Sequence, residues 1–325
     1  MLPSLSSTWP TKFVMYGADP EFTIVKLDGT PAPAHLFFPA KDKPITHGPW
    51  SLYRDGYMLE VGVRPSKHPQ VVIDYVRGAL RDAASLLPKG YKIISSPTVP
   101  IDLSFLKEEN VPGDLRSFGC EPSYNAYTCD ISMPEVQATE HPWRYAGEHM
   151  HFGIHPSNNH LLPWFKSEEC RMFFIKMLDR GLGVPLAFLT DGPLQYARRK
   201  YYGKAGEFRL QKYPGEFYGV EYRTPTGVFH RAGIGVWAYG IAEWVLHNFA
   251  AIANGWDKQA EEATRHAIDT GEGLADMLLA MPGFYDKETL LEIKKRLTFS
   301  LMEETDVPSW SEWATQNSIS YPQVR

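Results

Sequence analysis

Cysteine is scarce in this sequence, which contains only Cys120, Cys129 and Cys170 among 325 residues. Three cysteines are too few for the disulfide framework of a secreted protein of this size, and their spacing fits no zinc motif. We therefore expect a protein of a reducing compartment and predict a cytoplasmic location.

Long uninterrupted hydrophobic runs are also missing. The longest apolar stretch, residues 232–254, is interrupted by Glu243, His247 and Asn248. Because such groups are costly inside a bilayer, we interpret this stretch as a buried helix and not as a membrane span. The first ten residues carry neither a cationic start nor an apolar core, so we expect no signal peptide and no lipid anchor.

An excess of positive charge is missing as well. The chain has 33 Lys and Arg against 38 Asp and Glu, which gives a net charge of -5. General nucleic-acid binding is therefore disfavoured, because it needs a surface that is basic overall, although a local basic patch is compatible with this balance. With 43% hydrophobic residues, the chain can bury the core of one large domain or of two small ones.

The hydrophobic pattern predicts a mixture of strands and helices. Strands are expected at residues 12–25, 58–63, 91–94, 149–154, 207–210 and 221–223, the last two as an antiparallel pair. Helical spacing of apolar residues predicts helices at residues 69–87, 167–181, 232–253, 258–270, 274–281 and 287–297. Residues 31–49 are expected to form a loop, and residues 100–142 and 190–206 to be irregular. Strands interrupted by helices and followed by a helical C-terminal third predict an α+β fold.

Several of these strands separate polar from apolar side chains by position. Successive side chains of a strand point to opposite faces, so Leu59, Val61 and Val63 can face a core while Glu60 faces away from it. By the same alternation, three further pairs lie on the face opposite the apolar side chains of their strands: Asp19 with Glu21, His149 with His151, and Glu221 with Arg223. A solvated strand face normally carries Lys, Thr or Ser, whereas these positions carry metal ligands and a phosphate-binding group.

The acids on these strands are candidate metal ligands. Asp19 and Glu21 share one strand face, while Glu60 and Glu221 come from other strands. Any one of them alone is more often a solvated acid or an ion-pair partner. Mg²⁺ prefers carboxylate oxygens together with water and substrate phosphate, so the set favours a site for two Mg²⁺ or Mn²⁺ ions.

The histidines and arginines extend this interpretation to phosphate. His149 and His151 share a strand face, and beside hard carboxylates one of them on the metal and the other on a phosphate is more plausible than a zinc site. Arg209 and Arg223 each follow an acid by two residues, and a planar guanidinium is suited to phosphate. The other cations, Arg198, Lys200 and Lys204, are expected to be solvated, with Lys204 kept as a candidate contact of the cofactor.

Five short motifs follow one another along the chain. They are YGADPEF (residues 16–22), GCEPSYNA (119–126), GEHMHFG (147–153), YGKAGEFR (202–209) and YGVEYRTP (218–225). Over about residues 12–245 this ordered set resembles the phage-type COOH-NH2 ligases of the glutamine synthetase and glutamate–cysteine ligase superfamily. Two positions depart from the pattern: Asp19 stands where many members have Glu, and Ser123 where an acid is expected.

The resemblance implies a curved, mainly antiparallel sheet that is lined with ligands of metal and ATP and backed by helices, as in the catalytic domain of glutamine synthetase. It implies one catalytic domain over residues 1–325, with residues 246–325 as a helical extension, in the host cytoplasm if the chain is phage-encoded. The implied activity joins a small-molecule or peptide carboxylate to an amine, using ATP and an acyl-phosphate intermediate.

The resemblance also assigns roles to residues. Glu21 and Glu60 would hold one ion, and Asp19, His149 and Glu221 the other. The contacts to ATP phosphates or to the acyl phosphate would come from His151, Arg209 and Arg223, with Lys204 as a further candidate. A base that deprotonates the amine would be Glu121, Glu148 or Glu207, and the residues leave this choice open.

Three alternatives use the same residues. A metal-dependent phosphohydrolase or phosphotransferase would need no amine. A phosphotransferase of the guanidino-kinase type would transfer phosphate to nitrogen and form no amide. A noncatalytic carboxylate-binding or virion protein would keep the fold but tolerate loss of the acids. The identity of the two substrates and the oligomeric state cannot be inferred from the sequence.

Overall fold

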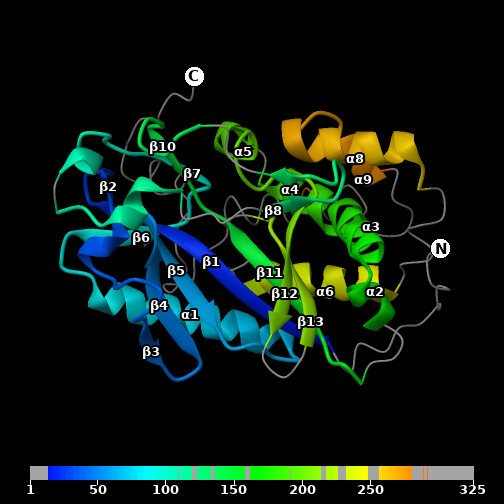
Figure 1. Cartoon of the computed structure of the whole chain (residues 1–325), viewed down its shortest axis with the longest axis horizontal. Helices are drawn as coiled ribbons and strands as arrows, with labels where there is room; N and C mark the ends of the chain where they lie inside the picture. The colour runs from blue at the N-terminus through cyan, green and yellow to red at the C-terminus, as the bar shows by residue number, and fades with distance from the viewer. Residues whose placement is uncertain are drawn as a thin grey trace.

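The computed structural model describes residues 14–108, 110–118, 123–132, 136–157, 162–190, 192–213, 217–225, 232–247, 256–279, 288 and 291. Within these residues the chain forms a large antiparallel sheet with helices packed against it (Figure 1). The fold is thus a mixed one of helices and an antiparallel sheet, as the sequence pattern predicts.

The main sheet has eleven strands in the part of the chain that the structure describes. Their order is β3-β4-β5-β1-β11-β13-β12-β8-β9, and β2 and β6 also pair with β1. The strands are β1 (Val14–Lys26), β2 (Pro31–Ala32), β3 (Ile45–His47), β4 (Trp50–Asp55), β5 (Met58–Val63), β6 (Tyr91–Ile94), β8 (Ser123–Asn125), β9 (Ile131–Ser132), β11 (Glu148–Ile154), β12 (Glu207–Tyr213) and β13 (Phe217–Tyr222). A separate pair joins β7 (Thr98–Pro100) to β10 (Trp143–Tyr145).

The helices among the described residues are α1 (Pro69–Leu86), α2 (Leu162–Lys166), α3 (Glu168–Leu178), α4 (Val184–Leu189), α5 (Pro193–Arg199), α6 (Ala232–His247), α8 (Lys258–Thr270) and α9 (Leu274–Leu279). Short 3-10 turns occur at η2 (Ala34–Leu36), η3 (Phe105–Lys107) and η4 (Gly113–Arg116), and one π-helical turn at η5 (Asp179–Gly183). Local signals fix several ends: Pro69 begins α1, the Ser167 hydroxyl accepts from the Cys170 amide at 3.3 Å at the start of α3, and Gly271 ends α8 with a φ of 83°.

Strand β1 lies in the middle of the sheet and changes partner along its length. From Val14 to Pro20 it pairs with β11, then Glu21 and Phe22 pair with β5, and Thr23 to Lys26 pair with β6. In Figure 1 it is the long blue strand that runs between β5 and β11. The residues in the middle of β1 therefore have neighbours on both sides.

The core lies on one face of this sheet, as the alternation of the sequence predicts. On β1, the buried core side chains include Tyr16, Ala18 and Phe22, while Asp19 and Glu21 have the opposite parity. The same core contains the apolar positions of the other strands, namely Leu59, Val61, Met150, Phe152, Ile154, Phe208, Val220 and Tyr222. It also contains side chains of α1, α3 and α6, so these helices pack against the apolar face of the sheet.

Most predicted elements are confirmed, and some predictions are wrong. The strand at residues 91–94 and helices α1, α3 and α8 lie where the pattern places them, and the strand predicted at residues 207–210 extends to Tyr213. The predicted loop at residues 31–49 contains β2, η2 and β3, the irregular stretch 190–206 contains helix α5, and strand β4 has no predicted counterpart. The predicted helix at residues 287–297 lies outside the described residues except for positions 288 and 291.

The apolar stretch after residue 232 forms helix α6, which lies in the core. Its buried side chains include Ala238, Tyr239, Ala242 and Val245. The interpretation as a core helix is confirmed for residues 232–247. Of the helices that the structure describes, none has both the length and the apolar character needed to cross a bilayer.

Candidate active site

The first group of candidate ligands forms where β1, β11 and β13 run side by side. Asp19 is opposite His149 across β1 and β11, and His151 is opposite Glu221 across β11 and β13. His149 Nδ1 lies 3.0 Å from Asp19 Oδ1 and 3.3 Å from Glu221 Oε1. Ligand atoms of Asp19, His149 and Glu221 all lie within 4.8 Å of one another, a spacing that one divalent ion can bridge.

The second group forms where β1, β4 and β5 meet. Glu21 is opposite Glu60 across β1 and β5, and Asp55 is the last residue of β4. Oxygens of these three acids also lie within 4.8 Å of one another. The Lys41 ammonium and the Tyr53 hydroxyl both donate to Glu60 Oε1, at 3.1 Å and 2.6 Å. Two carboxylate-rich groups therefore lie next to each other, because Asp19 of the first and Glu21 of the second are two residues apart on β1.

Like charges crowd in the second group. Burial, reinforced by the charges of Asp19 and Asp55, raises the pKa of Glu60 to about 8. Burial also raises the pKa of Glu21 well above its ordinary value, with Asp55 and Glu60 adding to the effect, and burial raises the pKa of Asp55. These three carboxylates, two of them buried and Asp55 half-buried, resist ionising together and form a donor set of hard oxygens, which suits a divalent cation.

Opposite charges meet in the first group. Burial alone would raise the pKa of Asp19, but His151 and His149 hold it well below its ordinary value. Burial would lower the pKa of His151, and the charge of Asp19 raises it instead. Burial, assisted by the nearby Arg223, lowers the pKa of His149 to about 4. His149 is therefore neutral at neutral pH, which is the form that binds metals.

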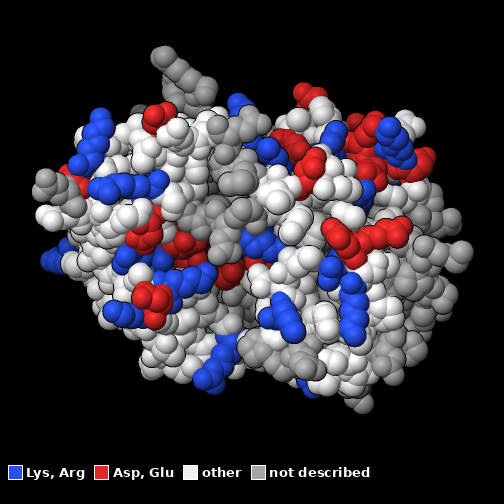
Figure 2. All heavy atoms as spheres, in the orientation of Figure 1, with Lys and Arg blue, Asp and Glu red and all other residues white. Residues whose placement is uncertain are grey.

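The two predicted arginines reach the first group from β12 and the end of β13. Arg223 is buried, and its guanidinium contacts Glu221 and donates to the Tyr202 hydroxyl at 3.0 Å. Arg209 is opposite Glu221 across β12 and β13, with its Nη1 atom 3.6 Å from Glu221 Oε1. On the face of the molecule that Figure 2 shows, acidic side chains are recessed near the centre, with basic ones beside them. The site thus combines acids that can hold cations with cations that can hold anions.

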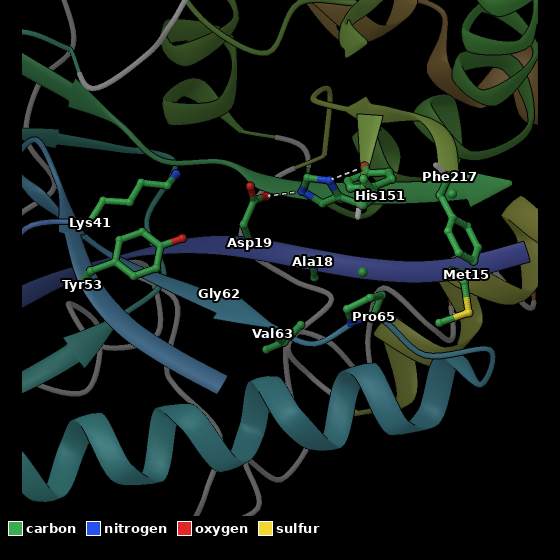
Figure 3. A pocket seen from close by; sticks show the side chains of 13 residues that line it. Met15, Ala18, Asp19, Lys41, Tyr53, Gly62, Val63, Pro65, His151 and Phe217 are labelled. Carbon is green, nitrogen blue, oxygen red and sulfur yellow. Dashed lines mark hydrogen bonds and ion pairs between the residues drawn. The ribbon is translucent and has the colours of Figure 1, made fainter. Parts of the chain in front are cut away.

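A cavity of about 510 Å³ continues the polar face along β1 beyond Asp19. Its wall includes Met15, Val63 and Phe217 together with glycines at positions 17, 62 and 153. Figure 3 shows Asp19 and His151 pointing toward each other at this wall, with Lys41 and Tyr53 on one side and Met15 and Phe217 on the other. The apolar end of the cavity can accept a ring, and its polar end borders the first group.

The three candidates for the base are Glu121, Glu148 and Glu207, of which the structure describes the last two. Glu207 is buried on the polar face, where Ser132 Oγ and the Gly203 amide each donate to one of its oxygens at 2.7 Å. Glu148 is fully buried and shares the parity of the core residues of β11, away from the two histidines. Glu121 lies outside the described residues.

The expectation that Arg198 is solvated is wrong. Arg198 has no exposed surface, and its guanidinium donates to the carbonyl oxygens of Arg223, Thr224 and Pro225 at 3.1 to 3.2 Å. Its helix, α5, packs beside the end of β13, which the sequence alone does not indicate. Lys200 is exposed as expected, while Lys204 is half-buried.

Several residues of the site are missed by the sequence interpretation. Asp55 completes the second group, the Tyr213 hydroxyl lies 2.7 Å from His151 Nδ1, and Gln211 donates to Glu221 at 2.7 Å. For Asp55 a signal exists, because the dipeptide Asp55-Gly56 is typical of a hairpin turn between two strands. Tyr213 and Gln211 give no such signal, because their roles depend on which strand lies beside β12.

The antiparallel sheet carries two adjacent groups of side chains that could bind metal ions, and arginines flank them. Such a site is typical of an enzyme that acts on anionic substrates. Residues 138–272 match the family model described as Phage phiEco32-like COOH.NH2 ligase-type 2. The match confirms the resemblance to the COOH-NH2 ligases over this part of the chain, and it supports the enzyme class that the resemblance implies, a carbon–nitrogen ligase. It covers β11, β12 and β13 with His149, Glu221 and Arg223, but not β1, β4 or β5.

Solved structures also resemble the chain at low identity. A bifunctional glutathione synthetase from Pasteurella multocida is 14% identical with a TM-score of 0.41, over 89% of this chain and 47% of its own. The Pup ligase PafA, in complex with Pup, is 10% identical with a TM-score of 0.45, over 96% and 63%. Glutamate–cysteine ligase from Francisella tularensis, in complex with AMP, is 11% identical with a TM-score of 0.44, over 94% and 85%. The chain thus spans less than two thirds of the first two proteins.

No curated protein matches the chain significantly.

Proposed function

We propose that this protein is an ATP-dependent carboxylate–amine ligase that activates its carboxylate substrate as an acyl phosphate at two divalent cations. The observation that carries the proposal is the pair of adjacent ligand groups, to which β1 contributes Asp19 and Glu21, two residues apart. Both groups lie on the same sheet face as Arg209, Arg223 and His151. The family match over residues 138–272 supports the ligase class of this reaction.

The residues present fit two divalent cations. Glu21, Asp55 and Glu60 would hold one ion, since burial and mutual repulsion raise their pKa values and the charge of Lys41 offsets this only in part. The second ion would be held by Asp19, His149 and Glu221. Divalent cations bound there would neutralise phosphate charge and act as Lewis acids. Mn²⁺ can take the place of Mg²⁺, because an imidazole is among the ligands.

The nucleotide would lie along the cavity that borders the first group. Its apolar end, near Met15 and Phe217, would receive the base, and the phosphates would extend toward His151 and the two arginines. A planar guanidinium matches the oxygens of a phosphate, and the two arginines lie on the polar face where charge would collect. Lys204 is a further candidate for a phosphate contact.

The reaction requires activation because a carboxylate offers an amine no leaving group. A carboxylate oxygen attacks the γ-phosphorus of ATP, the bond from phosphorus to ADP breaks, and the amine then attacks the acyl carbon and releases phosphate. The nitrogen loses protons to a base, for which Glu207 and Glu121 are the candidates. Holding the partners in line contributes up to about 7 to 11 kcal/mol relative to free reactants. Closure of the site against water would protect the intermediate.

The substrates would be a small-molecule or peptide carboxylate and an amine. We further infer that the catalytic unit is a single domain, because β1 contributes to both ligand groups and pairs on both sides. The cytoplasm, with its supply of MgATP, is the compartment in which such a ligase would act.

The experiment that tests the proposed function follows an oxygen atom. With MgATP, an amine and a carboxylate labelled with ¹⁸O on both oxygens, one labelled oxygen should appear in inorganic phosphate, and the amide should keep the other. Hydroxylamine should intercept the intermediate as a hydroxamate. A hydrolase would leave the label of the carboxylate untouched, and unlabelled phosphate during amide formation would exclude an acyl phosphate.

A further inference from the structure

Tyr202 lies between His149, which would bind a cation, and Arg223, which would bind phosphate. It lies in the segment that joins α5 to β12, and its side chain is buried. Its ring has the Arg198 guanidinium 4.8 Å from the centroid and the Arg223 guanidinium 5.1 Å from it. Two cations in contact with one aromatic ring fix its position firmly.

The Tyr202 hydroxyl contacts both parts of the site. It lies 2.5 Å from His149 Nε2, and Arg223 donates to it at 3.0 Å. Because one ring nitrogen of His149 faces Tyr202, the other one, Nδ1, is directed toward Asp19 and Glu221. A hydrogen bond to the nitrogen that does not bind the metal sets the orientation and tautomer of a ligating histidine.

The backbone around Tyr202 is built for this position. Gly203 has a φ of 68°, and a Cβ atom there would lie only 2.1 Å from the guanidinium of Arg198. Arg198 in turn donates to the carbonyl oxygens of Arg223 and Thr224 at 3.1 and 3.2 Å, so it holds the chain that carries Arg223. Tyr202, Arg198 and Arg223 thus form one packed unit behind His149.

We propose that Tyr202 is a positioning residue whose hydroxyl joins His149 to Arg223, so that cation binding at His149 and phosphate binding at Arg223 strengthen each other. This inference rests on the proposed function. Binding of a cation on Nδ1 requires the proton on Nε2, which then donates to the Tyr202 oxygen. Arg223 already donates to that oxygen, so the position of its guanidinium responds to the state of His149.

The test compares Tyr202→Phe with Tyr201→Phe. The first change keeps the ring between the guanidinium groups and removes only the hydroxyl. Tyr201 is a matched neighbour that stacks on Tyr145, with ring centroids 5.5 Å apart, and does not contact His149 in any described interaction. Both variants should melt within a few degrees of the wild type.

The readout is Mn²⁺ binding to the resting protein by calorimetry, with and without a nonhydrolysable ATP analogue. The Mn²⁺ site that is lost in His149→Gln is the one that uses His149. At this site Tyr202→Phe should bind Mn²⁺ about 10- to 100-fold more weakly, the loss typical of removing an outer partner of a ligating histidine. It should also lose most of the increase in affinity that the analogue produces, while Tyr201→Phe should keep both. In the His149→Gln background, Tyr202→Phe should have no further effect.

Equal Mn²⁺ affinity and equal enhancement by the analogue in Tyr202→Phe and the wild type would overturn the inference while leaving the proposed function intact. Equal losses in both tyrosine variants would also overturn it, because they would indicate a general structural effect. If the wild type binds no Mn²⁺ in either condition, the proposed function itself fails, and the inference fails with it.

Discussion

Glu60 is a single side chain whose surroundings make the stability of the protein depend on pH. Its carboxyl is buried beside Asp55 and Glu21, and burial raises its pKa from 4.5 to about 8. Between these two values the folded protein retains a proton that the unfolded chain releases. Because the folded state binds more protons, stability falls as pH rises through this window.

Without divalent metal, the titration of Glu60 should therefore lower the melting temperature progressively as the pH rises from about 4.5 to about 8. Glu60→Gln removes the titration and should flatten the decrease, as measured by thermal unfolding across a pH series. The exposed Glu262→Gln is the matched control and should leave the slope unchanged. The assignment is wrong if Glu60→Gln keeps the wild-type slope.

At this scale the sequence predicts much of the site, because strand parity depends only on neighbouring residues. Asp19, Glu21, Glu60, His149 and Glu221 are all brought into two groups by the structure. Whether they bind metal stays a prediction. The sequence does not reveal the burial of Arg198, since it depends on carbonyl groups at the end of β13, 25 to 27 residues away in the sequence.

Helix α1 and strand β4 show at the scale of elements how the sheet and its helical layer are fitted together. The Trp50 indole of β4 lies against Gly78 in the middle of α1, and an added Cβ atom at position 78 would be 2.6 Å from the Trp50 ring. The Trp50 indole nitrogen also donates to Asp82, one turn further along α1, at 2.9 Å. The glycine lets the helix approach the strand closely.

Gly78→Ala should therefore destabilise the protein, although alanine ordinarily stabilises a helix interior by about 0.5 to 1 kcal/mol relative to glycine. Gly240 of α6 provides the control, because it is exposed and an added Cβ atom there meets nothing within 4 Å. Gly240→Ala should stabilise the protein. Both changes are measured by denaturant unfolding, and the same sign for both variants would contradict the packing argument.

Elements with a clear period were predicted, and elements without one were missed. Helix α1 repeats buried Val72, Val76, Ala79 and Ala83 at helical spacing and was found with its ends nearly correct. Helix α5 has no continuous apolar stripe in its seven residues, because its buried positions mix Leu194 and Ala197 with polar Gln195, Arg198 and Arg199. Strand β4 gives no clear signal because neither of its faces is purely apolar: Tyr53 and Asp55 lie on the face of Glu60, while Leu52 shares the other face with Arg54, which pairs with Asp114.

At the scale of the whole molecule, the two ligand groups use strands that lie on opposite sides of β1 in the same sheet. β1, β4 and β5 supply the second group, and β1, β11 and β13 supply the first. A cation in either group would link strands that are distant in sequence. A ligand present at 100 times its dissociation constant adds about 2.7 kcal/mol to the free energy of unfolding.

Mg²⁺ or Mn²⁺ together with ATP should accordingly raise the melting temperature of the protein by several degrees. Glu21→Gln and Glu221→Gln each remove a ligand from one group, so each should lose most of this increase and abolish ATP turnover while the protein remains folded. Glu262→Gln again serves as the control. Wild-type ATP turnover in both variants would show that these acids do not bind the catalytic metal.

The position of Asp19 and Glu21 on one strand has a consequence for how such a protein can vary. Their Cα atoms are two residues apart on β1, a separation of about 7 Å that the extended backbone fixes. An insertion or deletion of one residue between them would turn one of the two acids into the apolar core. The distance between the two ligand groups is thus set by the peptide unit itself, so β1 must keep its length and change in substrate preference has to come from the segments around it.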